Sequence, residues 1–248
     1  MEKKETNAKT ENENKNGNVN VNRCFSCADC AVMNCAKRNS VYPKFCPTAE
    51  LTQEEIEEIS QLYIKNRQNH KVAVAAAEIE GEFYGKYTRV EEIVEFAKRI
   101  GAKKIGIATC IGLLEESKIF AQILRLNGFE VYGVSCKAGS VNKTHIGVDE
   151  KYTCVTGPVM CNPILQAKQL NKEKVDLNVI VGLCVGHDSL FIKYAKGLTT
   201  TLITKDRVLG HNPVAALYQS RAYYKKLLLA PVGEEIDYSK IPVGNISK

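Results

Sequence analysis

The feature that most constrains the fold is a regular alternation of apolar runs and helical segments between residues 103 and 206. The runs KKIGIATC, FEVYGVSC, LNVIVGLC and TTLITKD predict strands, and a segment with helical periodicity separates each run from the next. Strands that alternate with helices form right-handed crossover units and a parallel sheet. The sequence therefore predicts an α/β fold, a Rossmann-like open parallel sheet of about four or more strands with helices on both faces.

Helices are also predicted before and after this alternation. Two Thr-x-x-Glu patterns have the spacing of a capping box, which marks the start of a helix: Thr52 with Glu55, and Thr88 with Glu91. Between them, the alanine-rich stretch 72–79 predicts another helix. After the last strand, residues 213–229 predict one long final helix.

The ten cysteines fall into two groups, five between Cys24 and Cys46 and five between Cys110 and Cys184. The first residues of the chain are rich in Asn, Lys and Glu and lack the apolar stretch of a secretory signal, which predicts a cytoplasmic location. Thiols stay reduced in the cytosol. The cysteines therefore indicate metal or redox chemistry and not a disulfide framework.

The distribution of cysteines and apolar residues predicts four parts. They are a disordered tail (1–23), a small Cys-rich metal-binding module (24–50), a helical connector (51–87) and an α/β domain with cysteines at its strand ends (88–248).

The first cysteine group consists of Cys24, Cys27, Cys30, Cys35 and Cys46. Its first three members form C-x2-C-x2-C, a run typical of 4Fe-4S iron–sulfur loops, in which a tight turn directs successive sulfurs to one centre. The later spacing departs from the ferredoxin pattern, so a zinc site remains an alternative. The sequence does not decide which four of the five cysteines are ligands.

The second cysteine group consists of Cys110, Cys136, Cys161 and Cys184. Three of them end predicted strands, and Cys161 precedes a predicted helix start. Ligands of open parallel sheets bind outside the carboxyl ends of the strands, so we expect these four residues to bind a cofactor there. Buried cysteines also pack as small hydrophobes, which is the alternative. Cys154 is either a fifth member or a spare thiol.

Two histidines are candidates for catalysis, for metal ligation or for proton transfer. His187 follows Cys184 in G-L-C-V-G-H-D-S, and His211 follows the fourth predicted strand in G-H-N-P. Histidine titrates near neutral pH and is a common metal ligand. Each of these two histidines could instead be an ordinary loop residue.

Several functions are excluded or disfavoured. The net charge of +6 is spread along the chain with acids in between, which argues against a nucleic-acid surface. No apolar run approaches the roughly 20 residues of a membrane span. The chain also lacks a dinucleotide loop, a Walker loop and a G-x-S-x-G elbow.

The motif combination resembles a known prokaryotic family. The segments CFSCADCAVMNC, FCPT, IATCIGL, SCKAG, CNP, VGLCVGHDSLF and TKDRVLGHNPVAALY, between about Cys24 and Leu229, are similar to domain of unknown function 1847, described as predicted metal-binding proteins. The resemblance implies metal binding and an anaerobic prokaryotic source, and it supplies no reaction. The family motifs include these residues: Cys110, Cys136, Cys161, Cys184, His187 and His211.

Three functional hypotheses follow. The first is an iron–sulfur redox or electron-transfer protein with one centre in each cysteine group and a redox partner protein. The second is a zinc protein whose α/β domain binds a small molecule or metal ion for sensing or delivery. The third is a thiol enzyme in which Cys184 beside His187 is the nucleophile. The sequence gives no substrate and no oligomeric state.

Overall fold

The computed structural model describes residues 25–38 and 41–236. The predicted disordered tail and Cys24 lie outside the described residues. The chain forms two compact units, Met1–His70 and Lys71–Lys248, and each is considered by itself. The four-part division expected from the sequence stays a prediction.

The first unit contains short elements and one longer helix. They are a 3-10 turn η1 (Cys27–Asp29), helix α1 (Pro47–Glu50), helix α2 (Gln53–Lys65) and the beginning of α3 (Arg67–Phe83). Thr52 accepts a hydrogen bond from the Glu55 amide, and the Glu55 side chain accepts one from the Thr52 amide, so the predicted capping box is confirmed. The rings of Phe25 and Phe45 stack with their centroids 5.7 Å apart.

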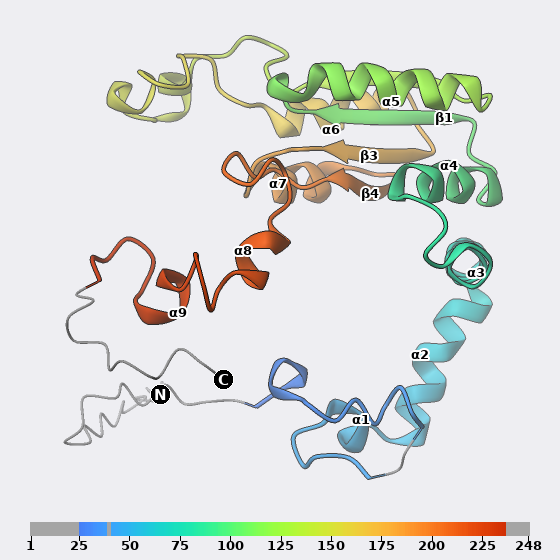
Figure 1. The fold of residues 1–248 in the computed structure, drawn as a ribbon. Coiled ribbons are helices and arrows are strands. Elements are labelled where there is room, and N and C mark those ends of the chain that lie inside the picture. Colours follow the sequence, from blue (N-terminus) through green and yellow to red (C-terminus); the bar gives the residue numbers. More distant parts are fainter. Residues whose placement is uncertain (1–24, 39–40, 237–248) are drawn as a thin grey trace, which may run out of the picture. The chain divides into compact units, whose positions relative to one another are not determined.

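The second unit is built on a four-stranded sheet in the order β2-β1-β3-β4, in which all neighbouring strands are parallel. Figure 1 labels three of these strands, β1, β3 and β4. The strands are β1 (Lys104–Thr109), β2 (Glu130–Ser135), β3 (Leu177–Val181) and β4 (Leu198–Ile203). Because β1 and β3 are central, their residues are nearly all buried. The predicted α/β class and parallel sheet are confirmed.

Helices cover both faces of this sheet, as expected. On one face α4 (Arg89–Arg99) and α5 (Leu114–Leu126) pack on Ile105, Ile107 and Val179. On the other face α6 (Pro163–Lys172) and α7 (His187–Tyr194) pack on Ala108 and Ile180. Successive strand residues point to opposite faces, which is why Ile107 and Ala108 belong to different cores.

Shorter elements lie between these helices and strands or follow β4. They are the 3-10 turns η2 (Ile111–Leu113), η3 (Lys143–Ile146) and η4 (Glu150–Tyr152) and the short helices α8 (Val214–Tyr218) and α9 (Lys226–Leu229). Among the helices in the described part of the chain, none combines the length and the apolarity that crossing a membrane requires.

The prediction of one long final helix over 213–229 is wrong. The structure has α8 and α9 with turns between them, and the Tyr224 amide donates to the Gln219 carbonyl five residues back. Tyr218 and Tyr223 are exposed, and neither short helix has a buried residue. Most helical stability in proteins comes from packing an apolar face, and this segment lacks such packing.

Candidate functional site

The register of β1 and β2 places two cysteines side by side at the carboxyl edge of the sheet. Thr109 pairs with Ser135, and the next residue of each strand is Cys110 or Cys136. The Cys136 amide donates to the Thr109 carbonyl at 2.8 Å, which extends the ladder by one bond. Neighbouring strands are about 4.8 Å apart, and both cysteines face the α6 side, with Cys110 7% and Cys136 2% exposed.

Cys161, in the loop before α6, lies at the same carboxyl edge of the sheet. The Asn162 amide donates to the Cys136 carbonyl at 2.7 Å, and the Asn162 side chain accepts from the Leu165 amide and caps the helix. The Cys136 side chain lies in the same core cluster as Cys110, and the Cys161 side chain packs against this cluster. Three thiols from separate segments of the sequence therefore form one contact group, which we call the thiol cluster.

Gln166 holds the strand ends beneath the thiol cluster. This side chain is fully buried, and its Nε2 donates to the carbonyls of Thr109 at 3.1 Å and Val134 at 2.7 Å. It thus bridges β1 and β2, one residue before Cys110 and two residues before Cys136. Buried backbone carbonyls need such partners, and no feature of the sequence singled out this glutamine.

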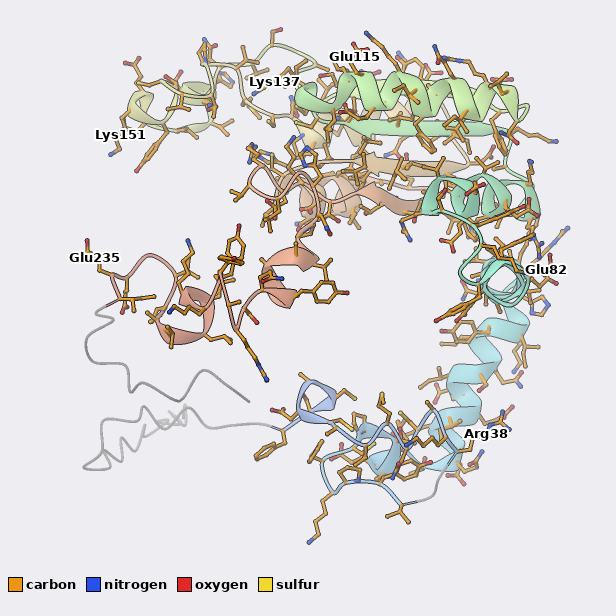
Figure 2. The ribbon with its side chains drawn as sticks, viewed as in Figure 1. Arg38, Glu82, Glu115, Lys137, Lys151 and Glu235 are labelled. Carbon is orange, nitrogen blue, oxygen red and sulfur yellow. The ribbon has the colours of Figure 1, made fainter. Side chains whose placement is uncertain are left out.

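Basic side chains surround the thiol cluster. His187, the first residue of α7, is hydrogen bonded to Cys161, and the Lys137 charge acts on the same thiol. Figure 2 shows Lys137 at the edge of the sheet where the strands end. Lys205, which follows β4, interacts with Cys110. In the sequence, Lys205 lies at the carboxyl end of the fourth predicted strand, and this position could have identified it as a residue of the site.

These contacts shift the pKa values of the three cluster thiols in different directions. The hydrogen bonds from Cys136 and His187 lower the pKa of the Cys161 thiol, and Lys137 adds to this effect. The hydrogen bond from Cys136, the Gly112 amide and Lys205 lower the pKa of Cys110. Contacts with both neighbours and burial raise the pKa of Cys136. Cys136 is therefore the thiol of the cluster that loses its proton least readily.

Cys184 takes part in a different contact. Its Sγ accepts a hydrogen bond from the Arg207 guanidinium at 2.9 Å, and its carbonyl accepts the amides of His187 and Asp188 at the start of α7. No contact described in the structure links its thiol to the thiol cluster. The thiol beside His187 is therefore that of Cys161, where Cys184 was expected.

His211 has a structural role in the turn after β4. Its amide donates to the Asp206 carbonyl at 2.8 Å, its Nδ1 accepts the Asp206 amide at 3.2 Å, and its φ of 68° is in the left-handed region. Cys154 is exposed in the loop between η4 and α6. No described contact connects either residue to the thiol cluster.

The first cysteine group is only partly described. Cys27 and Cys35 are exposed, and Cys46 is buried at the start of α1. Cys30 accepts hydrogen bonds from the amides of Met33 and Val32, which lower the pKa of its thiol. Cys24 lies outside the described residues, so the ligand set proposed for this group stays a prediction.

The donor chemistry of the thiol cluster suits a thiol-seeking metal, since it combines three cysteine sulfurs with the His187 imidazole. Within residues 25–38 and 41–236, however, no set of three or more His, Cys, Asp or Glu side chains has the arrangement that would hold a metal ion. The cluster thiols pack against one another and their apolar neighbours instead. Metal binding would require them to turn from these contacts toward a common centre.

Residues 46–202 match the family described as protein of unknown function (DUF1847). The chain belongs to this family. It is 48% identical over 201 residues to uncharacterized protein MJ0455 of Methanocaldococcus jannaschii, which covers 79% of this chain and 98% of that protein. The resemblance expected from the cysteine and histidine motifs of this DUF1847 protein is therefore confirmed.

Among solved structures, this DUF1847 protein is similar to Dph2 from Pyrococcus horikoshii. The matches are to a crystal structure with a 4Fe-4S cluster, at 20% identity, and to another Dph2 crystal structure, at 19%. Each covers 57% of this chain and 33% of Dph2, with a TM-score of 0.31. At this TM-score the likeness supports no inference about a shared ligand.

Proposed function

We propose that this DUF1847 protein is a metal-binding redox protein whose α/β unit binds an iron–sulfur cluster through Cys110, Cys136 and Cys161. The observation that carries the proposal is the contact of Cys136 with both other thiols, which gathers three sulfurs from separate segments at the carboxyl edge of the sheet. Ligands of open parallel sheets bind at this edge. Such a cluster, when bound, supplies one-electron transfer.

Backbone amides favour iron–sulfur ligation at these cysteines. The Ile111 amide donates to Cys136 Sγ at 3.3 Å, and the Gly112 amide donates to the Cys110 sulfur. Hydrogen bonds to ligand sulfurs stabilise thiolates and tune the reduction potential of iron–sulfur centres. Lys205 and Lys137 would offset the negative charge of the thiolates, and His187 would hold or release a proton beside Cys161.

We further propose that four members of the first cysteine group bind a second metal centre. The support is the C-x2-C-x2-C run together with the backbone N–H groups that point to Cys30. Electrons would then pass between this centre and the thiol cluster, with an external redox protein as their source.

A zinc site without redox chemistry is the second candidate. It is favoured by the contact between Cys161 and the His187 imidazole, because three cysteines and one histidine form a common set of zinc ligands. In this case the α/β unit would bind a metal ion or small molecule for sensing or delivery.

Metal analysis of the full chain after purification without oxygen tests these proposals. We expect iron, acid-labile sulfide and visible absorbance, and we expect C110S, C136S and C161S to lose part of each. C154S is the matched control, since Cys154 is exposed and outside the thiol cluster. A colourless protein with zinc alone would favour the second candidate, and a protein without bound metal would overturn both.

A further inference from the structure

We propose that Cys136 and Cys161 form a dithiol–disulfide couple that exchanges with small external disulfides. The Asn162 amide donates to the Cys136 carbonyl at 2.7 Å, and the Cys161 side chain packs against the core cluster that contains Cys136, so the two thiols are neighbours before any reaction. A disulfide requires Cα atoms about 4.4–6.8 Å apart and a particular dihedral angle across the bond. Formation of the bond therefore requires the loop before α6 to bring the Cys161 sulfur into this geometry.

The position of Cys161 in the fold makes it the partner that can adjust. Cys161 precedes the N-cap of α6 and lies outside regular structure. Cys110 and Cys136, in contrast, follow paired strands whose ends are fixed by the Cys136 amide and by Gln166. A bond between these two would have to form within the fixed register of β1 and β2. We therefore expect Cys136 to bond to Cys161 in preference to Cys110.

The exposure of the thiols determines the order in which they react with an external disulfide. Cys161 is partly exposed, whereas Cys110 and Cys136 are buried. An external disulfide can therefore reach Cys161 first, and the buried thiol beside it can then resolve the mixed disulfide. His187 is hydrogen bonded to Cys161 and acts as a positioning residue for this thiol.

The reaction balances with a small disulfide, such as oxidised glutathione, as the oxidant. The Cys161 sulfur attacks one sulfur of the reagent, the S–S bond of the reagent breaks, and one half leaves as a thiol. Cys136 then attacks the Cys161 sulfur and releases the second half as a thiol. In total the protein loses two electrons and two protons, and the reagent is reduced to two thiols.

The couple itself does not depend on a metal. Its consequence for the metal site rests on the proposed function, because the disulfide would remove two of the three sulfur ligands. Binding of metal at the thiol cluster and formation of the disulfide would then exclude each other.

The test is to incubate the full chain, stripped of metal by a chelator, with oxidised glutathione without oxygen, and to map the products by non-reducing proteolysis and mass spectrometry. We expect a crosslink between Cys136 and Cys161. C136S should stop at one glutathione on Cys161, C161S should form neither product, and C154S should behave as the wild type.

A crosslink between Cys110 and Cys136, or none in the folded wild type, would overturn the couple. The wild-type map decides this even if C136S, altered at a buried position, fails to fold. Metal content separates the two proposals. A crosslink in a protein that never binds metal would support the couple and overturn the proposed function. A protein that binds metal but never forms the crosslink would support the proposed function and overturn the couple.

Discussion

The imidazole of His187 and the thiol of Cys161 interact, and each changes the acidity of the other. The contact lowers the pKa of Cys161 and raises that of His187, because the thiolate and the imidazolium stabilise one another. The hydrogen bond from Cys136 acts on Cys161 in the same direction and is the larger cause.

We therefore predict that Cys161 stays reactive at mildly acidic pH. A thiol of ordinary pKa, about 8.5, loses reactivity roughly tenfold for each pH unit below that value, because only the thiolate reacts. Since the pKa of Cys161 is lowered, its thiolate persists as the pH falls toward about 6. The measurement is the rate of iodoacetamide modification of Cys161, followed by mass spectrometry, with the urea-unfolded chain as reference. Equal pH profiles in the two states would contradict the prediction.

His187→Gln should shift this pH profile to higher pH, because it removes the imidazolium that stabilises the thiolate. His145→Gln is the matched control, since His145 lies in η3 and has no contact with the thiol cluster among the described residues. A profile unchanged by H187Q would show that Cys136 and Lys137, without His187, set the acidity of Cys161.

Cys184→Ser should leave the metal content of the α/β unit unchanged. The thiol of Cys184 is hydrogen bonded to Arg207 and has no described contact with the thiol cluster. Cys136→Ser should instead lower the metal content, because Cys136 contacts both other thiols. Iron and zinc analysis of the two variants, expressed side by side, checks the prediction. Equal losses of metal in the two variants would indicate that Cys184 is also a ligand.

Gln166→Leu should lower the free energy of unfolding by about 1–3 kcal/mol, since it leaves the buried carbonyls of Thr109 and Val134 without their side-chain donor. Urea unfolding followed by circular dichroism measures this change. Gln122→Leu is the control, because Gln122 is exposed on α5 and its replacement should change stability by less than about 0.5 kcal/mol. Equal effects of the two substitutions would argue against the bridging role of Gln166.

Gly182→Ala should be more destabilising than Gly186→Ala. Both glycines have positive φ, 69° and 83°, so each substitution carries a backbone cost of about 1–2 kcal/mol. A Cβ on Gly182 would also lie 2.0 Å from Leu113 Cδ1, whereas one on Gly186 meets nothing within 4 Å. The difference between the two unfolding free energies measures the overlap with Leu113, about 1–3 kcal/mol. A smaller loss for G182A would contradict this packing.

Local signals in the sequence predicted most of the elements. The capping boxes at Thr52 and Thr88 begin α2 and α4, and Gly101, with φ of 70°, follows the end of α4 as expected. The placement of Cys110 and Cys136 at one edge followed from the parallel sheet, because the carboxyl ends of its strands share that edge. The order of the strands was not predicted.

The features that depend on the direction of side chains could not be predicted from local signals in the sequence. Cys184 comes three residues after the end of β3, beyond the turn at Gly182, and its thiol meets Arg207. The contact of Cys161 with His187 depends on how α6 and α7 pack, which periodicity does not specify. The prediction of one long final helix was wrong for a related reason. Helical propensity without a packing partner does not hold 213–229 in one helix.

Lys205 has a consequence for how this unit is assembled during synthesis. The chain emerges from the ribosome in order, so all three sulfurs of the thiol cluster are made before β4 and the lysine that follows it. A nascent chain halted at the end of β3 would carry the cysteines without that counter-charge. The positive charge that Lys205 places beside Cys110 is therefore present at the sheet edge only when the fourth strand has docked.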